Sequence, residues 1–396
     1  MKKVIKVGRV PIKMWLDDLE EGALEQTVNL SNLPFVFKQV VLMPDAHQGY
    51  GMPIGGILAT KGYIVPNAVG VDIGCGMCSV KTNIHLGDLT IDDIKKIMSK
   101  IRERIPVGFN KHNEKQPLEF LPQPSINLTS RQSVVIQQWE NAQHQIGTLG
   151  GGNHFIELQK DKDNILWIMI HSGSRNLGKK VADHYNKIAR NLNERWFSEV
   201  KKDKDLAFLP LDSKEGKEYL EEMNFCVEFA LCNRKLMLKR ILESIQEVCY
   251  EKNITYVPEE LINIPHNYCR IENHFNENVI VHRKGATSAK EKEVGIIPGS
   301  QGTCSYIVLG LGNPESFCSC SHGAGRKMGR NVARRTLNLQ EEVDALNKKG
   351  IIHAIRNVTD LDEAPGSYKD IEIVMENQND LVKILVRLEP VGVVKG

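Results

Sequence analysis

The sequence lacks several features that would place it quickly in a known class of protein. It has no apolar run long enough to span a bilayer, and charge interrupts the first six residues too often for the hydrophobic part of a secretion signal. Lys and Arg number 51 against 49 Asp and Glu, so the formal net charge is only +2. We therefore expect a cytoplasmic protein without a membrane partner. Any nucleic acid must be held by a local basic surface, because there is no global positive field.

The usual nucleotide-binding signatures are absent as well. The chain contains neither G-x-x-x-x-G-K-[ST] nor G-x-G-x-x-G. It also has no Asp-Gly dipeptide, which excludes the K-x-D-G motif of lysine-type nucleotidyl ligases. A nucleotide, if one binds, must be held in another way.

Cysteine is present, but not in a pattern typical of secreted proteins. The nine cysteines are odd in number and scattered, which argues against a dense disulfide scaffold. Cys75 and Cys78 spell C-x-x-C, but no second such pair completes a zinc knuckle. We interpret Cys78 as a packing residue and most other cysteines as free thiols or metal ligands.

Apolar periodicity predicts a mixed α+β fold with β-sheets and surrounding helices. Strands are expected at 39–43, 54–59, 165–171, 279–282, 305–309 and 381–394. Helices are expected at 91–104, 131–144, 177–196, 217–250, 326–336 and 370–378. Strands gather early and late around a helical middle, whereas a Rossmann sheet would alternate strands with helices. We expect one domain over residues 1–396, with polar surface excursions near 106–124 and 201–218.

Residues able to do chemistry gather in short segments, most of them rich in glycine. Nearly all of these segments carry His, Asp, Cys, Arg or Ser, and they span 43–56, 68–77, 147–157, 171–178, 265–268, 282–288, 297–305 and 319–326. Glycine lets the backbone approach a ligand closely. We expect these loops to converge on one site.

Several of these segments indicate a metal site. Asp72 and Cys75 stand three residues apart in a glycine-bounded loop, so a carboxylate and a thiolate can turn toward one point. His154, His171 and His266 each stand beside an apolar segment or in a short polar loop. Singly, each is more often an ordinary polar residue than a ligand. Together they offer sulfur, nitrogen and oxygen to one or two divalent ions, and spacing does not decide between Mn²⁺ and Zn²⁺.

A candidate nucleophile, His322, stands in a glycine-flanked turn just before a basic stretch. A neutral imidazole can attack phosphorus when metal and arginine neutralise the phosphate oxygens, although a capping turn explains the motif equally well. The backbone of 298–302 could form an anion nest. Further candidates for phosphate binding are Arg175, Arg283, Lys284 and Arg326.

Taken together, these motifs resemble the RtcB family of RNA-splicing ligases. The matching stretches are MPDAHQGYGMPIGG (43–56), VGVDIGCGM (69–77), GTLGGGNHFIEL (147–158), HSGSRNLG (171–178), HNY (266–268), RKGA (283–286), IIPGSQG (296–302), SFCSCSHGAGR (316–326) and VVKG (393–396). They follow the family's order from near residue 34 to the end, so the resemblance is highly specific. The two polar excursions show no family pattern.

The resemblance implies a GTP- and Mn²⁺-dependent RNA ligase that serves RNA splicing or repair. It would join a 2′,3′-cyclic phosphate or 3′-phosphate end to a 5′-hydroxyl end, through a guanylylated His322 and an RNA-3′-pp-guanosine intermediate. By position, two Mn²⁺ ions would be held by Asp72, Cys75, His154, His171 and His266, with Cys75 suited to bridge them. The positions matching guanylate contacts are Asn153, His154, Phe155, Ile156, Glu157, His266, Asn267, Pro298, Gly299, Ser300, Gln301, Ser305, His322, Gly323, Ala324, Gly325 and Lys395. Asp45 and His47 lie in a motif loop that could assist the RNA step.

Two other functions fit the same residues. A metal phosphoesterase would use His322 as an acid or base and bind no guanylate, and a non-catalytic protein would only bind RNA ends. The intact ligand and nucleophile positions favour the ligase. The physiological RNA and the need for an archease-type activator stay open, and we expect a monomer.

Overall fold

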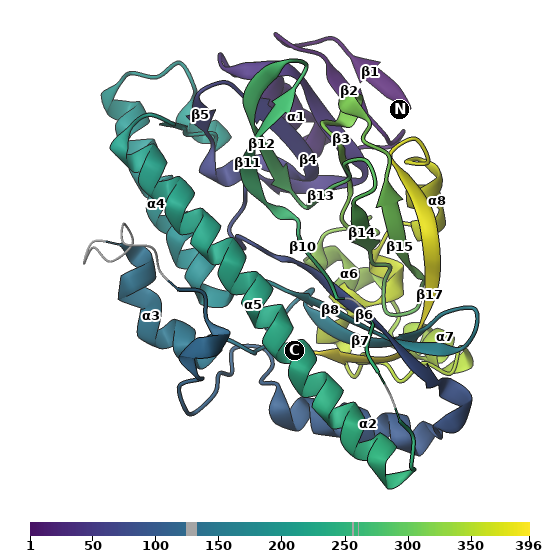
Figure 1. Ribbon diagram of the computed structural model, residues 1–396. Helices are drawn as coiled ribbons and strands as arrows, with labels where there is room; N and C mark the ends of the chain where they lie inside the picture. Colours follow the sequence, from purple (N-terminus) through teal and green to yellow (C-terminus); the bar gives the residue numbers. More distant parts are fainter. Residues whose placement is uncertain (124–132, 256, 260) are drawn as a thin grey trace.

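Two β-sheets form the framework of the computed structural model, which describes residues 1–123, 133–255, 257–259 and 261–396 (Figure 1). The first sheet has six strands in the order β1-β2-β3-β4-β12-β11. They are β1 (Lys3–Ile5), β2 (Ile12–Met14), β3 (Val36–Tyr50), β4 (Met52–Thr60), β12 (Glu277–Lys284) and β11 (Asn267–His274). β2 and β3 pair in parallel, and the other neighbouring strands are antiparallel.

The second sheet has seven strands in the order β10-β6-β8-β7-β17-β15-β14, all antiparallel to their neighbours. They are β10 (Ile262–Pro265), β6 (Gly76–His85), β8 (Ile165–Ser172), β7 (Phe155–Lys160), β17 (Val382–Lys395), β15 (Ser305–Gly310) and β14 (Val294–Ile297). Two small pairs join β13 (Ala286–Ser288) to β16 (Ser319–Ser321) and β5 (Tyr63–Ile64) to β9 (Leu209–Pro210). Because β13 follows β12 closely, β16 and the loop after it are held beside the first sheet.

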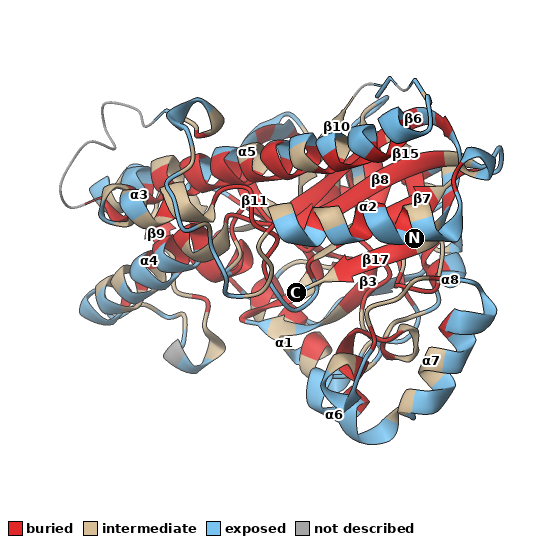
Figure 2. Cartoon of the chain, turned by 90° about the horizontal axis from the view of Figure 1, so that it is seen from below, coloured by how far each residue is buried: buried red, intermediate tan, exposed pale blue. Residues whose placement is uncertain are grey.

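Helices pack on both sheets. They are α1 (Glu21–Ser31), α2 (Ile91–Arg104), α3 (Val134–Gln145), α4 (Arg175–Arg195), α5 (Lys214–Glu251), α6 (Arg330–Thr336), α7 (Leu339–Lys348) and α8 (Ile371–Glu376). α1 packs against β3 and β4 of the first sheet, and α2 and α5 pack against the second. A capping box between Thr90 and Asp93 starts α2, and its buried residues recur every three or four positions. This apolar face packs with α5 against β6, β7 and β8, and Figure 2 shows the buried layer between them. No helix among the described residues is long and apolar enough to cross a membrane.

The structure confirms the mixed α+β prediction and finds a helix in each of the expected regions. α2 matches 91–104 residue for residue, and α5 extends the expected 217–250 by a few residues at its start. α6 begins only at Arg330, because Gly329 has an extended backbone and ends the turn before it. The first residues expected in α3, 131–132, and Pro124 of the first excursion lie outside the described residues. The single domain stays a prediction.

The expected pattern missed α1, α7 and several strands, of which β6 matters most. β6 is buried on both faces over its first half, so its residues do not alternate between apolar and polar. The sequence therefore predicts the loop at 72–77 but not the strand that fixes the position of this loop.

The structure corrects the expectation that Arg283 and Lys284 bind phosphate. Arg283 is fully buried and donates hydrogen bonds to Glu272 Oε1 at 2.6 Å, to Ser319 Oγ at 2.9 Å and to Phe317 O at 3.0 Å. Lys284 donates to two backbone carbonyls, those of Tyr50 and Asn67. A buried charge needs such partners, so both cations serve the fold, and Arg283 holds the segment that leads to His322.

Removing the charge of Glu272 should therefore destabilise the protein strongly. Glu272→Gln leaves the guanidinium of Arg283 buried without its counter-charge, and we expect the free energy of unfolding to fall by about 3–5 kcal/mol. Glu277 is the control, because its ion pair with Lys61 is about half exposed. In urea denaturation Glu277→Gln should change stability by less than about 1 kcal/mol, and equal effects of the two variants would contradict this account.

Candidate functional site

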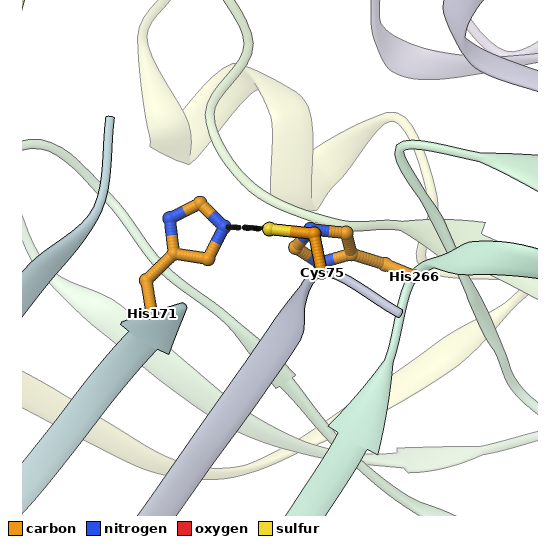
Figure 3. A group of neighbouring side chains, drawn as sticks. All are labelled: Cys75, His171 and His266. Atoms are coloured by element: carbon orange, nitrogen blue, oxygen red, sulfur yellow. Dashed lines mark hydrogen bonds between the residues drawn. The ribbon is translucent and has the colours of Figure 1, made fainter. Parts of the chain in front are cut away.

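The candidate metal ligands gather where four strands of the second sheet begin or end, and we call this row of strand ends the ligand edge of the sheet. β6 and β7 begin there, and β8 and β10 end there, because the strands pair antiparallel. Cys75 precedes β6, His154 precedes β7, His171 is the next-to-last residue of β8, and His266 follows β10. Figure 3 shows the side chains of Cys75, His171 and His266 beside these strand ends, turned toward one another.

The ligand atoms form two groups that share one sulfur. Cys75 Sγ lies 3.4 Å from His154 Nε2 and 3.3 Å from His171 Nε2. On one side His154 Nε2 is 3.1 Å from Asp72 Oδ2, and on the other His171 Nε2 is 3.4 Å from His266 Nε2. Within each group, Asp72–Cys75–His154 and Cys75–His171–His266, the atoms lie within 4.8 Å of one another. Metal bonds of roughly 2.0–2.3 Å set ligand atoms roughly 3–4 Å apart, so both groups could hold an ion.

Backbone carbonyls decide which ring nitrogen faces the cluster. His154 Nδ1 donates to Leu149 O and His171 Nδ1 to Asn153 O, each at 3.0 Å. The proton on Nδ1 leaves a lone pair on Nε2, which is how metal-binding histidines are commonly oriented. The described structure offers buried His266 Nδ1 no hydrogen-bond partner.

Burial and neighbouring charges shift the pKa values of these side chains, toward the metal-binding form for two of the histidines and Asp72 and away from it for Cys75. Burial lowers the pKa of His171 and of His266 well below the usual value, and the neighbouring histidines lower it further. Burial would raise the pKa of Asp72, but the close approach of His154 outweighs burial and holds this pKa below the usual value. Burial and the charge of Asp72 raise the pKa of the Cys75 thiol. A cation would oppose that last effect by favouring the thiolate.

Two polar residues of α5 hold the loops that carry the ligands. Arg234 is fully buried and donates to Gly74 O at 3.0 Å and to Ser172 O at 2.8 Å, next to Cys75 and His171 respectively. Asn233 accepts from Gly147 N and Thr148 N and donates to Gly173 O. The sequence predicts a helix at 217–250 but no part for it in the site, although a polar Asn-Arg pair within an apolar stripe is a visible signal.

A cavity of about 490 Å³ opens beside the cluster. It is lined by predicted residues from five segments, namely Asn153, Phe155, Glu157, His171, Pro298, Gly299, Ser300, Gln301, His322, Gly323, Ala324, Gly325, Arg326 and Lys395, together with His47. Its volume falls within the range of small-molecule sites. Gly325 has a φ of +71°, and a Cβ there would lie 2.2 Å from Asp45 O, so only glycine fits this wall.

His322 is held against this cavity by a buried carboxylate. Asp45 Oδ2 accepts from His322 Nδ1 at 2.6 Å and from its backbone N at 3.1 Å. Asp45 is fully buried, and its other oxygen, Oδ1, has no hydrogen-bond partner among the described residues. The imidazole rings of His322 and His266 lie 4.8 Å apart, centroid to centroid. The candidate nucleophile is thus oriented from one side and stands next to the candidate metal ligands.

Opposite charges line the far side of the cavity. Lys395 Nζ lies 2.6 Å from Glu363 Oε2, and Arg326 pairs with the other oxygen of the same carboxylate. Burial would raise the pKa of Glu363, but Lys395 and Arg326 bring it down to about 2. Burial raises the pKa of Glu157 to about 8, which only Gln159 and Lys395 oppose. Lys395, one residue from the end of the chain, is therefore buried rather than solvated.

Some predicted residues lie near the cavity without lining it. Ile156, in β7, packs in the core, and Ser305 Oγ accepts hydrogen bonds from Gln159 Nε2 and Gly299 N within the wall. Asn267 bonds Asp72 O and Gly285 N, so it braces two loops. Arg175 donates to Gly108 O and Thr148 Oγ1. Lining residues that sequence reasoning missed include Glu20, Arg330, Glu363 and Tyr368, and the segment carrying Glu363 and Tyr368 shows no motif.

Because the pKa of Glu157 is raised by burial in the folded protein, this residue makes the stability of the fold depend on pH. The variant Glu157→Gln removes that dependence. The folded carboxyl keeps its proton up to about pH 8, whereas the unfolded one loses it near its ordinary value of 4.5. Burial of Glu157 therefore costs stability progressively as pH rises through this window. In thermal unfolding, the gain in stability from Glu157→Gln should increase between pH 5 and pH 8, by at most about 1.4 kcal/mol per pH unit. A gain that does not change with pH would refute the assignment.

Comparison with known proteins identifies the family of this chain. The sequence model of the family described as "tRNA-splicing ligase RtcB" matches residues 26–396. The RNA-splicing ligase RtcB of Escherichia coli K12 is 36% identical over 413 residues, covering 100% of this chain and 99% of that protein. The tRNA-splicing ligase RtcB of Thermococcus kodakarensis is 30% identical over 466 residues, covering 100% and 96%. The chain therefore belongs to the RtcB family of tRNA-splicing ligases.

Proposed function

We propose that this chain joins RNA ends that carry a 2′,3′-cyclic phosphate or 3′-phosphate to ends that carry a 5′-hydroxyl, with GTP as the energy source. Membership of the family and the names of the relatives support RNA ligation. The observation that carries the chemistry is the setting of His322, which is bound through Nδ1 to buried Asp45, lines the cavity and lies 4.8 Å from His266.

Two divalent ions, which we propose to be Mn²⁺, fit the cluster described above. Asp72 and His154 would hold one ion, His171 and His266 the other, and Cys75 would serve both. The donor set of carboxylate, imidazole and thiolate suits a borderline divalent metal. When bound, the ions would supply positive charge that neutralises phosphate oxygens.

His322 would act as the nucleophile. Asp45 keeps the proton on Nδ1, so the lone pair of Nε2 attacks the α-phosphorus of GTP. A phosphorus–nitrogen bond forms, the bond from that phosphorus to the bridging oxygen breaks, and pyrophosphate leaves. Asp45 also stabilises the positive charge that develops on the ring, as a buried carboxylate does in other nucleophile–histidine pairs.

The cavity favours guanine over adenine. The Watson–Crick edge of guanine offers N1–H and N2–H₂ as donors beside the acceptor O6, whereas N1 of adenine is an acceptor. The carboxyl of Glu157 can accept from the donors and the ammonium of Lys395 can donate to O6. Phe155 and Tyr368 add flat apolar faces to the same walls.

The later steps transfer the guanylate to RNA. An oxygen of the RNA 3′-phosphate attacks the phosphorus on His322 and frees the imidazole, which gives RNA-3′-pp-guanosine. The 5′-hydroxyl then attacks the RNA phosphorus, a 3′,5′-phosphodiester forms, and GMP leaves. A 2′,3′-cyclic end first needs water to open it to the 3′-phosphate. Arg326 and Arg330, which line the cavity, are placed to neutralise phosphate oxygens.

Covalent labelling tests the proposal. The protein is incubated with α-labelled GTP and Mn²⁺ and then denatured, and we expect a label that is acid-labile, alkali-stable and absent in His322→Ala. Asp45→Asn should slow labelling by about 100-fold or more, because the orientation and charge of the imidazole change. His85→Ala is the control, since His85 is exposed and caps a short turn.

No label with any divalent metal, or full labelling of His322→Ala, would contradict the proposal. Opening of cyclic phosphate ends without GTP and without joining would instead identify a phosphoesterase.

A further inference from the structure

Phe109 is a fully exposed aromatic side chain close to the candidate site. Its relative exposure is 106%, above that of every other large hydrophobic side chain among the described residues. It lies in the first polar excursion, between Pro106 and α3, where the sequence shows no motif. Both faces of the ring are therefore open to solvent.

The backbone around Phe109 is fixed, so the ring is held outward. Asn110 N donates to Val107 O at 3.2 Å and closes a tight turn, in which Gly108 has a φ of +65°. Gly108 N donates to Gly150 O at 2.9 Å, and Arg175 donates to Gly108 O at 2.7 Å. Both backbone groups of Gly108 are thereby bound, and the turn cannot easily rotate the ring into the protein.

This turn lies against the glycine loop that leads to His154. A Cβ on Gly151 would come within 3.5 Å of Gly108 Cα, and one on Gly152 within 3.2 Å of Arg330 Nη1. The next residue, Asn153, lines the cavity. Phe109 and the guanidinium of Arg330 therefore flank the same exposed loop at the entrance to the cavity.

We propose that Phe109 stacks on a base of the RNA strand whose end enters the cavity. This inference rests on the proposed function, which brings a single-stranded RNA end to His322. A base offers a flat face of the kind that an exposed, pre-positioned aromatic ring binds, and neighbouring cations hold the sugar–phosphate backbone. Arg330 is 44% exposed but pairs with Asp362 Oδ2 at 3.2 Å, whereas Lys111, two residues after Phe109, donates to the neutral amide of Asn141. Lys111 is therefore the cation better able to face a phosphate, and Arg330 would have to share its charge with Asp362.

The surroundings of Phe109 fit a nucleic acid better than a protein partner. Its sequence neighbours Asn110 and Lys111 are exposed and polar, and the adjoining Gly151 and Gly152 present backbone only. A protein interface would bury a contiguous apolar patch around such an anchor. One exposed ring beside a cation offers a stacking face to one base, whatever the sequence of the RNA.

Binding of unligatable RNA tests the inference directly. The full chain with Mn²⁺ and without GTP is titrated into a fluorescent single-stranded RNA, and anisotropy gives the Kd. Phe109→Ala should weaken binding about tenfold, the effect of losing one stacked base. Phe109→Trp should bind as tightly as the unchanged protein, and Phe109→Leu should bind as weakly as Phe109→Ala, because stacking needs a ring.

Phe197→Ala is the matched control. Phe197 is 94% exposed and follows the end of α4, while Arg175 at the start of that helix contacts Gly108. The length of α4 sets the two phenylalanines roughly 30 Å apart. We expect this variant to bind RNA normally. An unchanged Kd in Phe109→Ala, or binding by Phe109→Leu as tight as by Phe109→Trp, would overturn the inference.

A fluorescent base shows which strand is stacked. 2-Aminopurine is placed in the penultimate position of a 3′-phosphate strand or in the first position of a 5′-hydroxyl strand. Quenching that depends on Phe109 in either strand supports the inference and assigns the strand, and quenching in neither contradicts it. Covalent labelling with GTP, which needs no RNA, should be normal in Phe109→Ala. A protein that binds RNA through Phe109 but takes no label would refute the proposed function and leave this inference standing.

Discussion

The antiparallel pairing of β10, β6, β8 and β7 is the constraint on which the site depends. It brings two strand starts and two strand ends to the ligand edge, so residues as distant in the chain as Asp72 and His266 meet around one sulfur. Backbone bonds such as His266 N to Cys75 O, 2.7 Å, fix the ligand loops to each other as well as to the sheet. The ligand positions are therefore set by strand register, and a shift of one residue would turn the side chains to the opposite face.

Polar groups buried beneath that edge maintain it. Arg234 and Asn233 of α5 bind the carbonyls and amides of the ligand loops. Arg283, which Glu272 neutralises, binds a carbonyl of the segment before His322. These groups are fully desolvated, so each must keep its partners for the fold to be stable. The two sheets meet at the cavity because each set of buried bonds ends there. Rigidity of this kind is what a site needs when it must hold several phosphates in line.

Much of the site could be predicted from the sequence, and the fold only in part. His154, His171, His266 and Cys75 carry recognisable loop motifs, and the structure brings them together, which spacing alone could not establish. Helices with one apolar face, such as α2, were found with their boundaries. β6 was missed because a strand buried on both faces has no alternation to detect. Glu363 and Tyr368 were missed because they reach the cavity from a segment without regular structure, and Arg283 was assigned to phosphate because the sequence could not show its buried partner, Glu272.

The sharing of Cys75 between two ions is the central claim, because it links the strand register to the chemistry at His322. Anomalous X-ray diffraction from crystals of the Mn²⁺-loaded protein tests it most directly. Our account predicts two anomalous peaks, one on each side of Cys75 Sγ, the first next to Asp72 and His154 and the second next to His171 and His266. A single peak bound without Cys75, or peaks away from this edge of the sheet, would contradict it.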